Sequence, residues 1–177
     1  LPGSKGPLLY PEEEVRKNPN AWNNIPIVVN HPMKDGIPVE ARSPDILERY
    51  QIGTVFNAKY NGKLIAEGWF DVERTRKVNT GVYDMLLNGR PIELSTGLYT
   101  DNEPFEGVHN GREYKFIARN YRPDHLAILL TSKGACSLKD GCGVLINKES
   151  PTTNIVHKIK GGYKLVSHKG KNLGTAK

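Results

Sequence analysis

Apolar and polar residues alternate along much of this chain, and a two-residue period predicts β-strands. The segment "IPIVVN" (25–30) is rich in β-branched residues, so we expect a buried strand that ends just before His31. Residues 51–60 and 63–72 show the pattern of a second pair of strands. The dipeptide Asn61-Gly62 between them is the strongest short-range signal for a β-hairpin.

The second half of the chain predicts three further strands. The segment "RPIELSTGLYTD" (90–101) alternates around Ser95. Residues 112–121 follow a predicted turn at Asn110-Gly111, and residues 125–130 follow a predicted turn at Pro123-Asp124. Strands joined by short turns favour a mainly antiparallel sheet.

Two segments carry helix signals instead. Ser43 is a typical N-cap residue and Pro44 suits the first helical position, which predicts a short helix there. Between residues 73 and 88 apolar side chains recur at helical spacing, and Gly89 suits the position after a helix end. We therefore expect one amphipathic helix directly before the Ser95 strand. Together these elements predict a mainly β fold of the α+β class, an antiparallel β-barrel with flanking helices packed outside it.

The composition fits a globular protein. The chain has 177 residues, 37% of them hydrophobic and 25% charged, which suits one domain with a small appendage. No apolar run approaches the roughly 20 residues of a membrane-spanning helix, so we expect a soluble protein with no membrane partner. Cys136 and Cys142 lack the second ligand pair that a structural zinc site needs. We expect two free thiols in a reducing cytoplasm.

Positive charge is concentrated toward the C-terminal end of the sequence. Lysine and arginine number 25 and aspartate and glutamate 19, so the net charge is 25 − 19 = +6, and no acidic residue follows Glu149. A basic end favours an acidic partner, either nucleic acid or a negatively charged protein assembly. We expect a main domain over 1–146, a linker over 147–155 and a basic C-terminal hairpin over 156–177.

Ser95 is the candidate nucleophile, and the alternative is that it is only a sheet hydroxyl. It does not lie in a Gly-x-Ser-x-Gly turn, because Glu93 takes the place of the first glycine, so the sequence does not fit an α/β-hydrolase. A serine nucleophile needs a base and a group that orients the base. His31 and His125 stand at predicted strand ends, where a rigid scaffold presents reactive side chains. The other three histidines lie in polar turn or tail segments and are expected at the surface.

The order of His31, Ser95 in "ELSTG" and His125 in "DHLAIL" resembles that of the assemblin-type serine proteases. These include herpesvirus assemblin and the prohead maturation proteases of tailed phages. The spacings, 95 − 31 = 64 and 125 − 95 = 30 residues, are compatible with that arrangement. The phage enzymes are the closer match, on "NHP", "LSTGLY", "RPDHLAIL" and "GACSLKDGCG". The resemblance covers roughly residues 25–145.

The resemblance implies an assemblin-type β-barrel with Ser95 as the nucleophile, His31 as the base that takes its proton, and His125 as the group that orients His31. Assemblin builds its oxyanion hole with paired arginines, in the stretch where this chain has Gly134. The backbone N–H of Gly134 is therefore the candidate oxyanion donor. In other phage branches the third position is acidic, and a carboxylate such as Asp124 is the alternative to His125.

The same resemblance implies that the chain is a serine endopeptidase of phage head maturation, and we expect it to use no metal and no organic cofactor. Its expected substrates are the capsid scaffold protein, or the scaffold domain of the major capsid protein, and its own termini. It would act inside the prohead in the host cytoplasm, and assemblin relatives suggest a homodimer. Two alternatives stay open: a Cys136 nucleophile served by His125, and a non-catalytic basic β-barrel module that binds nucleic acid or an acidic capsid partner.

Overall fold

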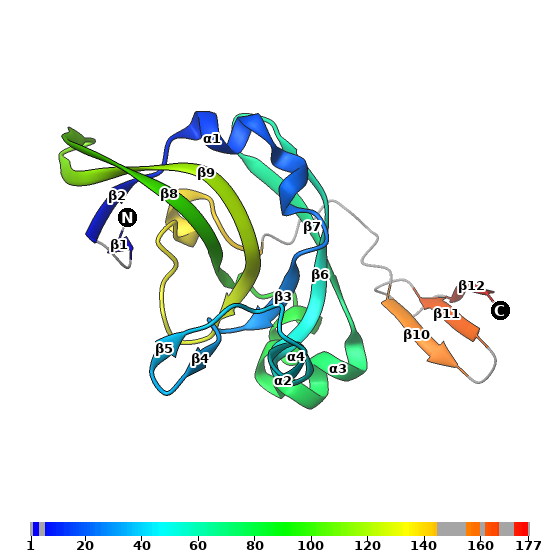
Figure 1. Ribbon diagram of the computed structural model, residues 1–177. Coiled ribbons are helices and arrows are strands. Elements are labelled where there is room, and N and C mark those ends of the chain that lie inside the picture. The colour runs from blue at the N-terminus through cyan, green and yellow to red at the C-terminus, as the bar shows by residue number, and fades with distance from the viewer. Residues whose placement is uncertain (1, 4–5, 145–154, 160–161, 167–171, 177) are drawn as a thin grey trace.

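The computed structural model describes residues 2–3, 6–144, 155–159, 162–166 and 172–176 and has an α+β fold that is mainly β (Figure 1). Seven strands form the main sheet, in the order β1 (Pro2–Gly3), β2 (Gly6–Leu9), β9 (Arg112–Leu129), β3 (Pro26–Val29), β6 (Gln51–Tyr60) and β7 (Leu64–Phe70), with β8 (Glu93–His109) also paired to β9. The described strands do not form a closed barrel. The class is thus confirmed, while the barrel is not.

Strand β9 is the centre of the sheet. It pairs antiparallel with β8 and parallel with both β2 and β3, so the sheet is mixed and not purely antiparallel. In Figure 1 β8 and β9 form a long curved ribbon whose tip projects away from the other strands. The tip is the predicted turn at Asn110-Gly111, and both residues adopt the positive φ angles (49° and 74°) that such a turn requires.

Strand β3 is buried on both faces, which explains its unbroken β-branched sequence. Ile27 and Val29 belong to one apolar cluster, and Val28 between them belongs to another, because successive strand residues point to opposite faces. The second cluster also contains Ala127 of β9 and Ala41. This second face of the sheet is the one on which the candidate site lies.

The hairpin predicted at Asn61-Gly62 is confirmed: β6 and β7 pair antiparallel across a three-residue loop, 61–63. The short helix predicted at Pro44 is confirmed as α2 (Pro44–Tyr50). The remaining short elements of the first half are α1 (Glu12–Lys17), the 3-10 helix η1 (Pro19–Trp22) and the two-stranded pair β4 (Met33–Lys34) and β5 (Ile37–Pro38). No described helix is long and apolar enough to cross a membrane.

The single helix predicted over 73–88 is wrong. The segment forms two helices, α3 (Val72–Val78) and α4 (Thr80–Leu87), separated by Asn79 in an extended conformation. The Asn79 side chain accepts a hydrogen bond from the Val82 N–H at 2.9 Å and so caps the start of α4. An asparagine side chain can hydrogen-bond to nearby backbone N–H groups in a non-helical conformation. Here it starts a new helix in this way and does not continue the preceding one. The predicted end of the helical segment is confirmed, since Gly89 follows α4 with φ 66°.

The predicted turn at Pro123-Asp124 is also wrong. Strand β9 runs through both residues without interruption. Opposite them, Gly97 of β8 pairs with His125 and Leu98 pairs with Pro123, so Asp124 is an extra residue in β9. This is a β-bulge, which bends the strand and redirects side chains but does not end the pairing.

Part of the predicted linker, 147–154, lies outside the described residues. In the region predicted to form the C-terminal hairpin, β11 (Gly162–Val166) pairs antiparallel with β12 (Asn172–Ala176), while the turn predicted between them lies outside the described residues. A third strand, β10 (Ile155–Ile159), pairs with β11, so this end of the chain is a three-stranded sheet.

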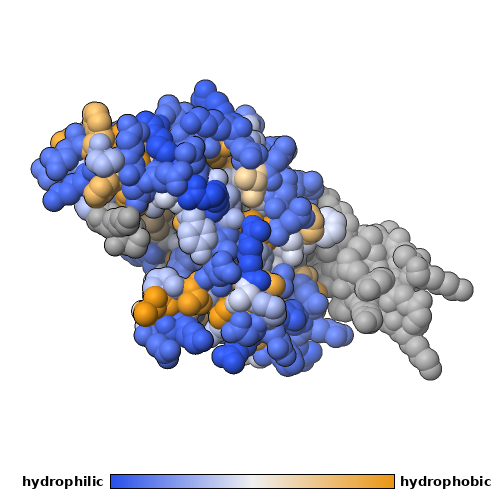
Figure 2. Space-filling model, in the orientation of Figure 1, coloured by the Kyte–Doolittle hydropathy of each residue, from blue (hydrophilic) through white to orange (hydrophobic). Residues whose placement is uncertain are grey.

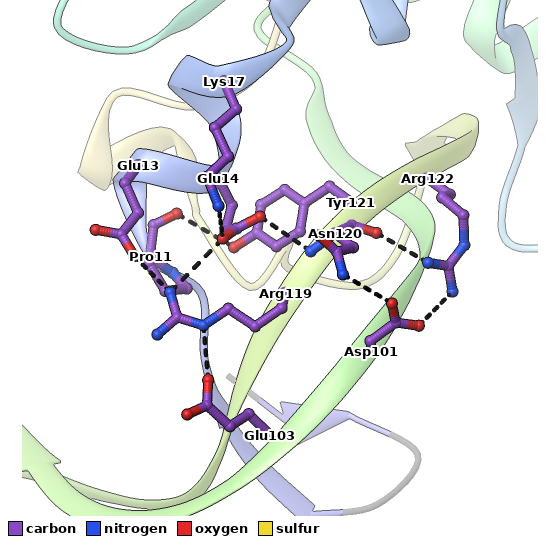
Figure 3. A network of polar contacts seen from close by, with 10 residues as sticks. All are labelled: Pro11, Glu13, Glu14, Lys17, Asp101, Glu103, Arg119, Asn120, Tyr121 and Arg122. Atoms are coloured by element: carbon purple, nitrogen blue, oxygen red, sulfur yellow. Dashed lines mark hydrogen bonds and ion pairs between the residues drawn. The ribbon is translucent and has the colours of Figure 1, made fainter.

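A network of charged groups attaches helix α1 to β9 (Figure 3). The buried Glu14 carboxylate accepts hydrogen bonds from Lys17 at 2.5 Å and from the Asn120 N–H at 2.9 Å, and lies 3.6 Å from Arg119. The hydrogen bond from Lys17 is the main reason why the pKa of Glu14 is lowered. Because the pKa of Glu14 is lower in the folded protein than in the unfolded chain, ionised Glu14 stabilises the fold at pH values above its unfolded-state pKa. This contribution to the free energy of unfolding is lost as the pH falls through the folded-state pKa.

Replacing Glu14 with alanine is expected to lower the free energy of unfolding by about 1–3 kcal/mol, because the Asn120 N–H would lose its acceptor. Urea unfolding followed by circular dichroism measures the change. Glu12 lies in the same helix, but its hydrogen bonds with Arg16 and Tyr60 are exposed to solvent, so the same substitution there should change the midpoint much less. Equal midpoints for the wild type and the Glu14→Ala variant would contradict this account.

Candidate active site

His31 is presented by a sharp turn at the end of β3. Asn30 has φ 59°, the left-handed conformation that asparagine tolerates well, and its N–H donates to the Ile128 carbonyl at 2.9 Å. The chain therefore leaves the sheet immediately after β3. His31 is half-buried, and the following Pro32 is fully buried.

The His125 imidazole occupies a niche that Gly97 creates. The two residues are paired across β8 and β9, so their side chains would project from the same face of the sheet. A Cβ atom on residue 97 would lie 2.1 Å from His125 Cε1 and 2.5 Å from each ring nitrogen. The ring thus lies over the glycine backbone, and the His125 side chain is only 7% exposed. Only glycine at position 97 permits this packing.

Two hydrogen bonds join His31, His125 and Asp124 in series. His31 Nδ1 lies 2.8 Å from His125 Nε2, and His125 Nδ1 lies 2.7 Å from Asp124 Oδ2. The bulge brings the adjacent Asp124 and His125 side chains together, whereas consecutive residues of a regular strand point to opposite faces. The Ala41 N–H donates to the same Asp124 oxygen at 2.8 Å, and Arg42 Nε lies 3.7 Å from Asp124 Oδ1.

Ser95 lies on the same face as this chain of groups. It is paired with Ala127, so its side chain projects on the same face as Gly97 and His125, two residues away along each strand. No described residue forms a hydrogen bond with the Ser95 hydroxyl, which is partly exposed. The structure therefore brings His31 and His125 into contact and places Ser95 on the sheet face that carries His125, without a hydrogen bond to His31. Catalytic hydrogen bonds often form only in the substrate complex.

The pKa of His31 is lowered, first by burial and then by the neighbouring His125. Both effects disfavour the charged imidazolium. A lowered pKa keeps His31 neutral at pH 7, which is the form that accepts a proton. Tyr99 follows on the same strand as Ser95 and is half-exposed, and its pKa is raised by burial and by the charges of Asp124 and Glu40.

The loop after β9 folds back along the start of β8. The Glu93 carboxylate accepts hydrogen bonds from the N–H groups of Gly134 and Leu138, both at 3.2 Å. The N–H of Val144 donates to the Ile92 carbonyl at 2.9 Å. Gly134 packs so closely that a Cβ atom there would lie 2.2 Å from the Leu94 carbonyl oxygen. The loop is thus anchored on the residues that precede Ser95.

The Gly134 N–H is already engaged by Glu93. Its role as an oxyanion donor stays a prediction, and that role requires Glu93 to release the N–H group when substrate binds. Sequence reasoning missed the loop-anchoring role of Glu93. The only signal was its position two residues before Ser95, and an acidic side chain in a strand is usually a solvated surface group.

The prediction of two free thiols is wrong, because Cys136 and Cys142 form a disulfide with a Cα–Cα distance of 5.7 Å. The 3-10 helix η2 (Leu138–Asp140) and Gly141, with φ 82°, turn the chain back between them and so bring the two cysteines together. The expectation assumed a reducing compartment, in which disulfides are uncommon. A disulfide sulfur is not a thiolate nucleophile, so the alternative of a Cys136 nucleophile is excluded in this oxidised form.

His109 is exposed, as expected, although it is the last residue of β8 and not part of the turn, and the other two histidines expected at the surface lie outside the residues whose side chains are described. Within the described part of the chain, no group of three or more histidine, cysteine or acidic side chains is arranged to hold a metal ion. No protein-family model, curated protein or solved structure matches this chain.

Proposed function

We propose that this protein is a serine endopeptidase in which Ser95 is the nucleophile, His31 the general base and His125 the group that orients His31. The observation that carries the proposal is the 2.8 Å hydrogen bond between His31 Nδ1 and His125 Nε2. This hydrogen bond engages Nδ1 of His31, so Nε2 of His31 is the nitrogen that can accept the Ser95 proton. The placement of Ser95 on the same sheet face supports it further.

The chemistry follows from these positions. His31 Nε2 takes the proton from Ser95 Oγ as the oxygen attacks a peptide carbonyl, and the imidazolium then gives this proton to the leaving amine. The resulting acyl-serine is hydrolysed by water in a second step of the same kind. Backbone N–H groups of the 134–138 loop are the candidate donors to the oxyanion, because this loop is fixed against the residues before Ser95.

The biological setting is proposed from the sequence resemblance to the prohead maturation proteases. The substrates would be the capsid scaffold protein, or the scaffold domain of the major capsid protein, and the enzyme's own termini. The reaction would take place inside the prohead in the host cytoplasm. An assemblin-type barrel and a homodimer belong to the same proposal, and so does a reaction that needs no cofactor.

Co-expression with candidate phage head proteins tests this function, with intact-mass spectrometry as the readout. The wild type should cleave a scaffold protein or scaffold domain, and Ser95→Ala should leave it intact. Ser132→Ala is the matched control, because Ser132 is an exposed hydroxyl in the nearby loop and should not be needed. Binding of an acidic head protein or of nucleic acid without any cleavage would favour the basic binding module instead.

The acid limb of kcat/KM against pH should have its midpoint below about 6.5, the ordinary histidine value. Activity falls on acidification because only neutral His31 accepts the Ser95 proton. The fall comes at a lower pH than for an ordinary histidine, because burial and the neighbouring His125 lower the pKa of His31. Rates are compared only where circular dichroism shows an intact fold. A midpoint well above 6.5 would contradict the assignment of His31 as a desolvated base.

A further inference from the structure

We infer that Asp124 is a positioning residue that holds both imidazoles as Nδ1–H tautomers and so leaves His31 Nε2 unprotonated and ready to accept the Ser95 proton. The inference concerns the same site and rests on the proposed function for its consequence in catalysis. The geometry on which it depends is independent of Ser95. It is the series of contacts from Asp124 through His125 to His31.

The proton positions follow from the chemistry of each group. A carboxylate only accepts hydrogen bonds, so His125 Nδ1 must carry the proton that lies between it and Asp124. A neutral imidazole has one N–H and one lone pair, so His125 Nε2 carries the lone pair and accepts from His31. His31 Nδ1 is then the donor, and the lone pair of neutral His31 lies on Nε2. One buried carboxylate thus determines the tautomers of two rings.

Asp124 is itself held firmly in this orientation. Its oxygen Oδ2, which faces His125, also accepts the Ala41 N–H at 2.8 Å, and Arg42 lies beside the other oxygen. Arg42 also donates through Nη2 to the Pro123 carbonyl at 3.1 Å, which ties the segment before α2 to the bulge. Tyr99 on β8 and Glu40 beside Ala41 are the other titratable groups here, and the pKa of Tyr99 responds to the charge of Asp124.

Asp124 also supplies the negative charge that a histidine in the third position lacks. When Ser95 Oγ bonds to the substrate carbonyl carbon, its proton moves to His31 Nε2 and His31 becomes a cation. The neutral His125 ring lies between this cation and the Asp124 anion and is hydrogen-bonded to both. The carboxylate therefore stabilises the developing imidazolium through one intervening ring, without a direct contact to His31.

The tautomers can be measured without any catalytic assay. In protein labelled with ¹⁵N-histidine, long-range ¹H–¹⁵N spectra at pH 8 should show His31 and His125 both protonated at Nδ1 and not at Nε2. Asp124→Ala should restore a mixture of tautomers in His125. Nε2–H on either ring of the wild-type protein would overturn the inference.

Asp124→Asn separates charge from orientation. The Ala41 N–H can only donate, so the amide oxygen is expected to take the place of Oδ2 and still accept from His125. We expect the tautomers to persist, kcat/KM to fall about tenfold to a hundredfold, and the acid limb to move to lower pH, because an imidazolium that has lost the nearby anion is harder to form. Asp101→Asn, an exposed carboxylate paired with Arg122, is the control and should change neither quantity.

The two proposals fail in different ways. If Ser95→Ala retains full cleavage, the peptidase assignment fails whatever the tautomers are. If Ser95 is essential but Asp124→Asn leaves both kcat/KM and the acid limb unchanged, only the role of Asp124 is overturned.

Discussion

Replacing either Ser95 or His31 with alanine should reduce kcat by about 10⁴- to 10⁶-fold, and the double replacement should reduce it little further. The reason is that the nucleophile and its base act as one unit, so removing either one removes the covalent step. His125→Ala should leave more activity, since His31 retains its own burial and loses only its hydrogen-bond partner. The measurement is cleavage of a head-protein substrate under single-turnover conditions.

His109→Ala is the matched control for the two histidine substitutions. His109 is exposed at the end of β8, next to the β8–β9 turn, and its replacement should leave kcat unchanged. Single-variant losses that simply multiply in the double variant would contradict a shared catalytic unit. A His31→Ala protein with wild-type kcat would remove His31 from the mechanism.

Gly97→Ala should reduce kcat/KM by about a hundredfold or more while the protein stays folded. The added methyl group would lie 2.1 Å from His125 Cε1, so the ring must leave its niche and give up its contacts with His31 and Asp124. Displacement of a catalytic group by about 1 Å costs about this much in rate. Gly97 does not have a positive φ angle, so alanine adds no backbone strain, and the effect should be specific to the ring.

Gly107→Ala makes a matched control for that substitution. Gly107 lies on the same strand, and a Cβ atom there would lie 2.6 Å from the Tyr114 hydroxyl oxygen, far along the ribbon from Ser95. It should lower the melting temperature without changing kcat/KM. If Gly97→Ala is fully active, the His125 niche is not needed for catalysis.

Local signals predicted much of the fold correctly. The Asn61-Gly62 and Asn110-Gly111 turns, the β-branched strand before His31 and the stop at Gly89 are all properties of a few adjacent residues. The errors at Asn79 and at Asp124 have another origin. Whether asparagine caps a helix or lies inside it, and whether Pro123-Asp124 forms a turn or a bulge, depends on packing and on the register of a distant strand.

In the candidate site, too, some features could be predicted from nearby residues and others depend on the pairing of distant strands. The sequence resemblance selected His31, Ser95 and His125, and the structure brings the two histidines into contact. The sequence could not show that a β-bulge would bring the Asp124 side chain into contact with His125, because the bulge depends on the pairing of Gly97 with His125. The sequence pattern also did not predict that apolar side chains of the β4–β5 hairpin, which closely follows His31, would be exposed at the surface (Figure 2).

The identity of the nucleophile is the central claim, and covalent labelling by a fluorophosphonate probe tests it most directly. The folded protein is treated with the probe at pH 8, digested and mapped by mass spectrometry. We predict a single adduct on the peptide that contains Ser95, absent in Ser95→Ala, strongly reduced in His31→Ala and retained in Ser132→Ala. An adduct at another serine, or a folded wild-type protein that takes up no probe, would contradict the account.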